Sequence, residues 1–348
     1  MKVLVTGISG FIGSHVAAAL AALGHRVTGT YRGNPPRILD RYRDGFRGTH
    51  VPGGTIDAVR ADLSEAEEIA PLLQDAEAIV HIAGFALDWG PAERFYRANV
   101  LPVEYILDYL ADHPGETRLF IHTSSLSVHG FGHQRGSDEA GPYYPLITHY
   151  QRSKLESEEL MQAAGKSAAC AMGIIRPGNA YGPGDTTIMY PMLDAIRAGK
   201  MGLVNRGRHL TCPVFIDDLV AAYLALFEKL ADADTDPAEV PVYNITGGED
   251  ISWRQLVEQA CGAADLPFPR LQVPGWLAMA AAMAMSGAYR LAGAKHPPDL
   301  TRYRIQQVSH DYHFRMDKAQ SELGWQPLIP FAQGIIETAA AWREHEIA

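Results

Sequence analysis

Short apolar runs alternate with longer amphipathic stretches through the first half of the chain. The runs that predict β-strands are residues 2–6, 26–31, 57–60, 78–82, 119–123 and 170–175. Helical stretches lie between them, at residues 16–23, 94–110 and 150–164. Continuous apolar runs such as KVLVT are typical of strands covered on both faces, and strands separated by helices indicate parallel βαβ units. The pattern therefore predicts an α/β fold built on a doubly wound parallel sheet.

The alternation weakens after residue 176. A loop rich in Gly, Pro and Asn occupies 178–184, and most of the later sequence is helical in pattern. A strand-turn-helix pattern at 214–228 and an apolar run at 242–246 resemble the first half again. Changes of this kind indicate a second structural unit whose chain partly returns to the first.

We predict a nucleotide-binding domain at 1–176 and a C-terminal substrate-binding region at 177–348. The C-terminal subdomain is expected to be smaller and mostly helical, and about 210–246 is expected to return to the core of the first domain. The chain has 348 residues, enough for one large α/β domain or a core domain with a smaller one.

The segment WLAMAAAMAMSGA at 276–288 is almost entirely apolar. It is too short to cross a bilayer, which takes roughly 20 residues, so no transmembrane segment is expected. We interpret the segment as a buried or pocket-lining helix. The alternative is a helix that rests on a membrane surface.

A glycine-rich turn comes directly after the first predicted strand. Gly7, Gly10 and Gly13 are spaced as GxxGxxG between that strand and the first helix. The first glycine permits the tight turn, the second allows close approach of a pyrophosphate, and the third allows the helix to pack on the sheet. The free N–H groups at the helix start favour phosphate. The pattern predicts a Rossmann dinucleotide site that also includes Ser9, Phe11 and Ile12.

The end of the second strand bears on the choice of nucleotide. An acidic residue there usually binds the ribose of NAD, but this strand ends in Tyr31-Arg32. Arg32 stands where the phosphate of NADP would lie, so NADP(H) is expected to be preferred and NAD(H) to be accepted. The alternative is an ordinary surface arginine. Asp62-Leu63 and Ala83-Gly84, which come after the next two strands, are also expected at the cofactor.

Tyr150 and Lys154 are four residues apart on a predicted helix, so they share one face. An ammonium group near a phenol lowers the phenol's pKa and suits it to proton transfer. Such a pair is expected by chance roughly 0.3 times in a chain of this composition, so the pair alone is weak evidence. Ser124-Ser125 comes after the fifth strand, at the sheet edge where ligands bind in open α/β folds.

These motifs together resemble the extended short-chain dehydrogenase/reductases. The matching pieces, in the order of the family, are TGISGFIG at 6–13, ADL at 61–63, HIAG at 81–84, NV at 99–100, TSSLSVHG at 123–130, YQRSK at 150–154, RPGNAYGPGD at 176–185, FIDD at 215–218 and LGWQP at 323–327. One departure is His129, where the family often has Tyr. We expect this histidine to alter the wall of the substrate pocket.

The resemblance implies an oxidoreductase in which a hydride passes between nicotinamide and a substrate carbon. Tyr150 is then the general acid/base, and Lys154 lowers its pKa and holds the nicotinamide ribose. Ser125 binds the substrate oxygen, with Ser124 as the competing candidate, and Asn99 supports a proton-relay water. The resemblance also places Pro177, Gly178 and Asn179 near the nicotinamide and implies a homodimer formed through the helices at 94–110 and 150–164.

Within this family the chain is most similar to the 3β-hydroxysteroid dehydrogenase and dihydroflavonol reductase branch. The similar pieces are DWGP at 88–91, FY at 95–96, PGW at 274–276, LTR at 300–302 and DY at 311–312. The branch implies a small-molecule substrate that is an apolar alcohol or ketone. One alternative is a nucleotide-sugar epimerase or dehydratase that retains NAD, with Arg206 and Arg208 on the diphosphate. Another is a cofactor-binding sensor without catalysis, against which the complete Ser/Tyr/Lys set argues.

The net charge and the cysteine content bear on the partners, disulfides and metal sites that are expected. The net charge is −10, which argues against a nucleic-acid partner. Cys170, Cys212 and Cys261 are far apart and form no CxxC pair, so neither a disulfide framework nor a metal site is expected. No secretory signal is evident at the start of the sequence, and we expect a cytoplasmic protein.

Overall fold

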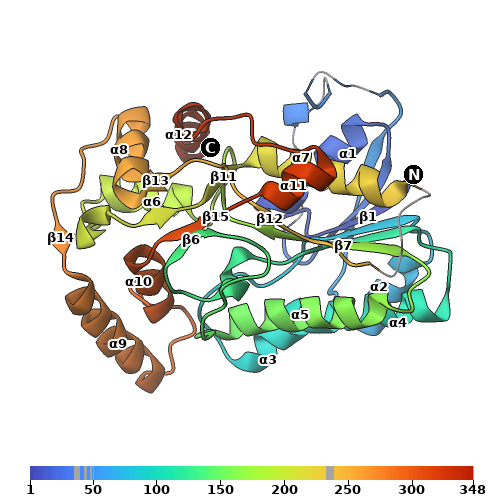
Figure 1. Ribbon diagram of the computed structural model, residues 1–348, viewed down its shortest axis with the longest axis horizontal. Helices are drawn as coiled ribbons and strands as arrows, with labels where there is room; N and C mark the ends of the chain where they lie inside the picture. Colours follow the sequence, from blue (N-terminus) through green and yellow to red (C-terminus); the bar gives the residue numbers. More distant parts are fainter. Residues whose placement is uncertain (35–39, 43–44, 48, 50, 233–238, 348) are drawn as a thin grey trace.

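A seven-stranded parallel sheet forms the centre of the protein in the computed structural model (Figure 1). The structure describes all residues except 35–39, 43–44, 48, 50, 233–238 and 348. The strand order of the sheet is β12-β7-β5-β4-β1-β2-β3. The strands are β1 (Lys2–Thr6), β2 (Arg26–Tyr31), β3 (Thr55–Arg60), β4 (Ala78–His81), β5 (Leu119–Thr123), β7 (Ala171–Pro177) and β12 (Val242–Ile245). The predicted α/β fold with a doubly wound parallel sheet is confirmed.

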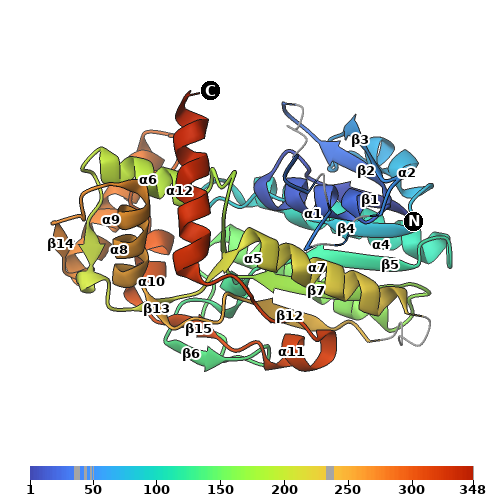
Figure 2. The ribbon, with the colours of Figure 1, turned by 90° about the horizontal axis from the view of Figure 1, so that it is seen from above.

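Helices cover both faces of this sheet (Figure 2). One face carries α1 (Phe11–Ala22) and α7 (Ile216–Ala231), and the other carries α2 (Ala66–Leu73), α4 (Leu101–Asp112) and α5 (His149–Gly165). Successive side chains of β1 point to opposite faces of the sheet. Val3 and Val5 pack in the apolar core on one face, and Leu4 packs in the core on the other face. Burial on both faces explains why these strands are continuously apolar in sequence.

The C-terminal half adds a second lobe beside the carboxyl ends of the strands (Figures 1 and 2). Its helices are α6 (Met189–Arg197), α8 (Trp253–Ala264), α9 (Gly275–Leu291), α10 (Arg302–Ser309) and α12 (Phe331–Ile347). Strand β12 and helix α7 belong to the central sheet layers, while α11 (Asp317–Leu323) packs against both of them. The chain therefore crosses between the two lobes more than once.

In the described residues, four two-stranded pairs join distant parts of the chain, and the hydrophobic pattern predicts only one of their strands, the one that begins the 214–228 pattern. They are β8 (Asn179–Tyr181) with β11 (Pro213–Phe215), β9 (Leu203–Val204) with β14 (Gln272–Val273), β10 (Leu210–Thr211) with β13 (Ile251–Ser252), and β6 (Gln134–Ser137) with β15 (Tyr312–Phe314). Segments this short carry too little alternation to be recognised. The second lobe is thus helical with short strand pairs at its base.

The single helix predicted at 94–110 is divided into three pieces. These are α3 (Ala92–Phe95), the π-helical turn η2 (Tyr96–Val100) and α4. Pro102 lies in the first turn of α4. Because proline has no N–H group, the hydrogen-bond ladder of the preceding turn cannot continue regularly through it, and π-turns of this kind are frequent at functional sites.

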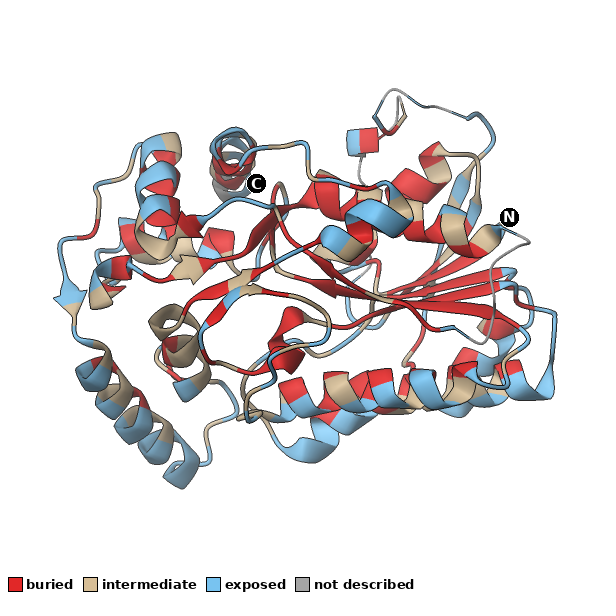
Figure 3. Ribbon diagram, viewed as in Figure 1, coloured by how far each residue is buried: buried red, intermediate tan, exposed pale blue. Residues whose placement is uncertain are grey.

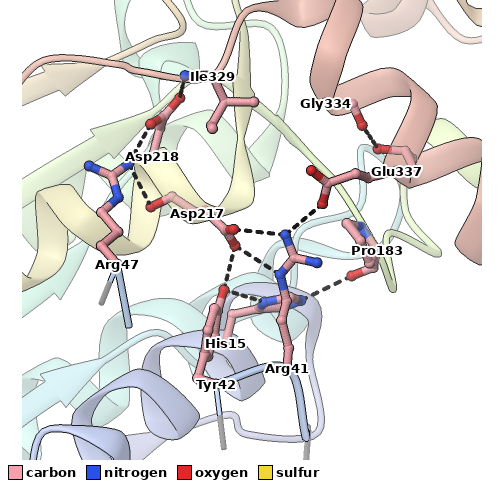
Figure 4. A network of polar contacts seen from close by, with 11 residues as sticks. His15, Arg41, Tyr42, Arg47, Pro183, Asp217, Asp218, Ile329, Gly334 and Glu337 are labelled. Carbon is pink, nitrogen blue, oxygen red and sulfur yellow. Dashed lines mark hydrogen bonds and ion pairs between the residues drawn. The ribbon is translucent and has the colours of Figure 1, made fainter. Parts of the chain in front are cut away.

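A polar network ties the first turn of α7 to two distant segments (Figure 4). Asp217 accepts hydrogen bonds from Arg41 and from the Tyr42 hydroxyl, the latter at 2.6 Å. Asp218, fully buried, accepts from the backbone N–H groups of Leu328 and Ile329 at 2.9 and 3.0 Å. The two carboxylates thereby fasten the segment after β2 and the chain before α12 to the central sheet layer.

Candidate active site

The glycine turn has the geometry that a dinucleotide requires. Gly7 has a φ of 76°, and Gly10 caps α1 without any side-chain hydrogen bond or acidic residue in the first turn. A Cβ atom on Gly13 would lie 2.3 Å from the Gly7 carbonyl oxygen, so only glycine allows the helix to start this close to the turn. The N–H groups at the start of α1 have no side-chain cap and are therefore available to a phosphate, as the sequence predicts.

The other residues expected along the turn take different positions. Ser9 is exposed at the tip of the turn, and Phe11 and Ile12 are the partly buried first residues of α1. Beside the turn, the Thr6 hydroxyl accepts hydrogen bonds from the N–H groups of Ile82 and Ala83, both at 3.0 Å. This threonine, the first residue of the TGISGFIG motif, joins the end of β1 to the end of β4.

Tyr31 and Arg32 lie at the end of β2, as predicted. The Arg32 side chain is largely exposed, and its nearest acid is Asp62, with Nη1 and Oδ2 3.9 Å apart. Asp62 accepts from the N–H and hydroxyl of Ser64, so it also caps the turn before α2, while Leu63 is buried in the core. A loosely held cation at this position is free to contact a ligand.

Tyr150 lies in the first turn of α5, which begins with a capping box between Thr148 and Gln151. Burial raises the pKa of Tyr150, and interaction with the neighbouring Ser125 side chain opposes the rise. The expected lowering by Lys154 does not appear, because burial dominates here. Of the two candidate serines, Ser125 lies next to the phenol. Ser124 is buried, and its hydroxyl has no hydrogen-bond partner among the described residues.

Lys154 is nine-tenths buried one helical turn after Tyr150, and its Nζ donates to the carbonyl oxygen of Thr123 at 2.8 Å. Burial lowers the pKa of Lys154 to about 8, although the charge of Glu158 acts in the opposite direction. At neutral pH the amine therefore remains mostly protonated. Gly84 makes room for it, since a Cβ there would lie 3.3 Å from Nζ and 2.9 Å from Asn99 Oδ1.

Asn99 is fully buried in the π-helical turn η2 and joins three elements. Its Oδ1 accepts from the N–H of Phe85 at 2.6 Å, and its Nδ2 donates to Ser153 of α5 at 2.8 Å. Its backbone carbonyl accepts from the Ser157 hydroxyl at 2.8 Å. In this arrangement Asn99 positions α5, and its part in a proton relay stays a prediction.

Pro177 ends β7, next to β12, and Asn179 begins β8. Asn179 donates to the Thr211 hydroxyl and accepts from Gln307, each at 3.0 Å. These bonds orient the asparagine toward the second lobe. A Cβ on Gly178 would lie 2.4 Å from the Cys212 carbonyl oxygen, so this loop also packs tightly on the second lobe.

A groove of about 980 Å³ reaches the residues just before Tyr150, although Tyr150 itself is not part of its lining. It is lined by residues from four segments, 88–95, 147–149, 283–295 and 301–303. Thr148 and His149, which line it, immediately precede the catalytic candidate. We call this cavity the groove. Three of the pieces that resemble the hydroxysteroid dehydrogenase branch, at 88–91, 95–96 and 300–302, contribute residues to it.

Tyr303 is a groove residue that the sequence motifs do not reveal. Its ring stacks edge-on against Phe131 with centroids 4.8 Å apart, and burial raises its pKa. A negative charge on Tyr150 raises the pKa of Tyr303 further. The two tyrosines come from α5 and α10, so only the tertiary structure brings them together.

Of the two positions expected for the helix at 276–288, buried or pocket-lining, the structure shows the second. In α9 only Ala278 and Ala282 are buried, and Trp276 is 74% exposed. Most of this helix is coloured as exposed or intermediate in Figure 3. The helix stands away from the core, because its partners are the short helix α10 and a few residues around it. It does line the groove, through Met283, Ser286, Gly287 and Arg290. Within the described residues, no helix is both long and apolar enough to span a membrane.

His129 does not form part of the groove wall, contrary to expectation. It is fully buried, stacks on Tyr143 with ring centroids 4.6 Å apart, and faces Arg176. Burial and then the Arg176 charge lower the pKa of His129 to about 4. The histidine is therefore a neutral core residue behind the site.

His133, His209 and Asp311 come close enough together to be considered as metal ligands. Asp311 already accepts from Arg135 Nε at 2.6 Å and from the Leu210 N–H at 3.1 Å. An arginine on the shared carboxylate competes with a cation there. We therefore interpret this group as part of the hydrogen-bonded contact between β10 and β15.

A family relationship accounts for this geometry. Residues 3–246 match the NAD dependent epimerase/dehydratase family. The chain belongs to this family. The match covers the glycine turn, the Ser/Tyr/Lys residues and the start of the second lobe, so the expected extended short-chain dehydrogenase/reductase relationship is confirmed.

Curated relatives of this epimerase/dehydratase family member are named oxidoreductases. A 2-alkyl-3-oxoalkanoate reductase of Shewanella oneidensis is 26% identical over 339 residues, covering 95% of this chain and 84% of that protein. A 3beta-hydroxysteroid-dehydrogenase/decarboxylase of Arabidopsis thaliana is 27% identical, covering 96% of this chain and 78% of that protein. The protein is accordingly an enzyme of the oxidoreductase and epimerase class.

Solved structures of family members share the fold. The UDP-glucuronic acid 4-epimerase of Bacillus cereus, in complex with NAD, has a TM-score of 0.74 at 20% identity, with 99% of both chains covered. A UDP-glucose 4-epimerase of Thermotoga maritima has a TM-score of 0.75 at 19% identity, covering 99% of this chain and 100% of that one. At these identities the likeness concerns the fold alone.

Proposed function

We propose that the enzyme is an NAD(P)-dependent reductase or dehydrogenase acting on a secondary alcohol or ketone of an apolar substrate. The observation that carries the proposal is the grouping of Ser125 with Tyr150, with the buried Lys154 one turn further along α5 and with the groove lined by the residues just before Tyr150. The names of the curated relatives, a 3-oxoalkanoate reductase and a hydroxysteroid dehydrogenase, support the same class of reaction.

A bound nicotinamide nucleotide supplies or accepts the hydride, and the protein supplies the rest. The Ser125 hydroxyl donates a hydrogen bond to the substrate oxygen and holds it next to the phenol. Tyr150 transfers its proton to that oxygen in reduction and takes it back in oxidation. The Lys154 ammonium stabilises the phenolate that forms, because it lies on the same face of α5. The ends of β1 and β4 hold the cofactor against this group.

Replacing the phenol tests the proposal. Tyr150→Phe removes the transferable proton, and kcat should fall by about 10²–10⁴-fold, while nucleotide affinity changes little. Tyr289→Phe on the exposed end of α9 is the matched control and should leave kcat unchanged. Turnover is followed at the nicotinamide absorbance band with a panel of ketones and alcohols. Full activity in Tyr150→Phe would reject the assignment.

We also propose that NADP(H) is preferred over NAD(H). Arg32 is 62% exposed at the end of β2 and is held by its acid neighbour only at 3.9 Å, so it can reach a 2′-phosphate. Arg32→Ala should weaken NADPH binding about tenfold and leave NADH binding nearly unchanged, as measured by fluorescence titration. Tighter binding of NADH than of NADPH by the unaltered enzyme would contradict this preference.

The second candidate function is nucleotide-sugar epimerisation with retained NAD. The shared fold of the solved epimerases favours it. Against it, Arg206 and Arg208 are exposed, and neither lines the groove. Mass spectrometry of the purified protein separates the two functions. Retained NAD with no net turnover of free nucleotide would favour the epimerase.

We further propose a cytoplasmic homodimer. The free, buried state of Cys170, Cys212 and Cys261 suits a reducing compartment. Helices α4 and α5 pack side by side with their outer faces uncovered, which suits a four-helix contact between two copies. Sedimentation analysis should give twice the mass of the chain. A monomer at micromolar concentration would reject this arrangement.

A further inference from the structure

The lining of the groove carries an excess of positive charge. Its lining includes four cations, Arg94, Arg290, Lys295 and Arg302, from segments far apart in the sequence. In the part of the chain that the structure describes, none of the four has a carboxylate partner. This is unusual for a chain with a net charge of −10, in which acids are plentiful. Unpaired cations that converge on one cavity indicate an anionic ligand.

The one acidic residue of the described lining does not neutralise them. Asp88 is nearly buried, and it accepts a hydrogen bond from the Thr301 hydroxyl. Its other oxygen lies 3.5 Å from Arg304, which is not part of the lining. Its charge is therefore already engaged behind the groove.

Two of the cations are held in place by aromatic rings. The guanidinium of Arg94 lies 3.8 Å from the ring centroid of Phe85, and that of Arg290 lies 5.4 Å from the ring centroid of Trp89. Trp89 is itself fixed, since its Nε1 donates to the Ala294 carbonyl oxygen at 3.2 Å. Stacking restrains each guanidinium while leaving its N–H groups available to a ligand.

The rest of the groove is chemically different. Phe95, Ile147 and Met283 give it an apolar wall, while His149 leads directly to Tyr150. A ligand that fits therefore has an apolar body, an oxygen that reaches the phenol and a negative charge near the four cations. Arginine suits a carboxylate because its N–H groups can bind both oxygens at once.

We propose that Arg94 and Arg290 bind a carboxylate of the substrate, so that the enzyme acts on apolar keto acids or hydroxy acids. This inference rests on the reductase function proposed above and specifies its substrate class. Lys295 and Arg302 add to the positive potential but lack a stacking partner among the described aromatic residues.

The test compares a 2-alkyl-3-oxo acid with its methyl ester, which has the same ketone and carbon skeleton but no charge. With NADPH present, kcat/KM should be at least tenfold higher for the acid, mainly through a lower KM. Arg290→Gln and Arg94→Gln should each reduce this acid-to-ester ratio several-fold, and the double variant should bring it near one. Raising the salt concentration should lower kcat/KM for the acid and leave kcat/KM for the ester unchanged.

Arg270→Gln is the matched control, because Arg270 is an exposed cation of the same lobe outside the groove. It should leave the acid-to-ester ratio unchanged. A ratio near one in the unaltered enzyme, or one that survives the double variant, would overturn the carboxylate site. Faster turnover of the coenzyme A thioester than of the free acid would also overturn it, in favour of phosphate binding. If no ketone is reduced at all, the proposed function fails instead.

Discussion

At the scale of single residues, the site depends on how closely a charged amine is packed. Lys154 donates to the Thr123 carbonyl and loses most of its water. Desolvation of this size lowers the pKa of the amine to about 8, so its positive charge is held at a cost in stability. The absence of a side chain at Gly84 leaves the space for it. The site therefore gives up some stability to place a cation beside the phenol.

The glycine turn gives a sharper prediction at this scale. In Gly13→Ala the added methyl group would meet the backbone of Gly7 at 2.3 Å, and backbone cannot rotate away as a side chain can. We expect a loss of about 1–3 kcal/mol in the free energy of unfolding and a larger loss of nucleotide affinity, since the turn itself must shift. Chemical denaturation and nucleotide titration measure the two effects.

Gly262 provides the comparison for that variant. It lies within α8, where a Cβ would meet nothing within 4 Å. Gly262→Ala should raise the free energy of unfolding by about 0.5–1 kcal/mol and leave the nucleotide affinity unchanged. Equal effects of the two substitutions would show that Gly13 is not needed for close approach.

At the scale of elements, hydrogen bonds to the first turn of α7 attach the chain before α12 to the central sheet layer. Asp218 Oδ1 accepts from the N–H of Leu328, and Oδ2 accepts from the N–H of Ile329, the contact drawn in Figure 4. The backbone carbonyl of Asp218 accepts from Trp325 Nε1 at 2.9 Å. The chain before α12 is thus attached to α7 mainly through one buried residue. This explains why a polar FIDD motif interrupts an otherwise apolar stretch.

Asp218→Asn should destabilise the protein by about 1–3 kcal/mol, because the amide cannot accept from both N–H groups and also loses the Arg47 ion pair. The free energy of unfolding from urea titration measures the loss. Asp57→Asn, on the exposed face of edge strand β3, should change it by less than about 0.5 kcal/mol. If the two variants matched, the attachment of the tail would have to lie elsewhere.

The sequence pattern predicts those elements that are determined by residues close together in the sequence. The bounds of β1 and β2 agree with their apolar runs, and the glycine turn and the Tyr150–Lys154 pair are recognisable because each lies within a few residues. The pair β10 with β13, in contrast, exists only because the tertiary structure aligns two residues of each. Arg94 and Arg290 converge for the same reason, and no spacing in the sequence predicts that convergence.

The exposed helix α9 shows a second limit of prediction from the sequence pattern. An apolar helix in a globular protein is usually buried, so its composition predicts a core position. Here the helix extends from the second lobe, where little of the chain is left to cover it. Whether such a helix is buried depends on the packing of the whole molecule and not on its own residues.

At the scale of the whole molecule, several histidines are buried in neutral form. Burial lowers the pKa of His15 to about 4 and that of His81 to about 3, and it also lowers the pKa of His122 and His129. His81 and His122 stack with ring centroids 5.6 Å apart, beneath Lys154. Protonating either ring would place a second positive charge next to the buried amine.

These shifts predict a loss of stability in mild acid. Each histidine has a lower pKa folded than unfolded, so the unfolded chain takes up protons first as the pH falls below about 6.5. Between pH 7 and pH 5 the free energy of unfolding should fall by roughly 2 kcal/mol for each such histidine. The carboxyls of Asp62 and Asp311 have lowered pKa values that act only below about pH 4, outside this window.

His122 allows the origin of the loss to be tested. Neither of its ring nitrogens has a hydrogen-bond partner among the described residues, so His122→Leu removes a titrating group without breaking a bond. Stability at pH 7 should change little, and the drop between pH 7 and pH 5 should shrink by roughly 2 kcal/mol. Urea titrations at both pH values measure this difference. An undiminished drop in the variant would mean that other groups cause the acid sensitivity.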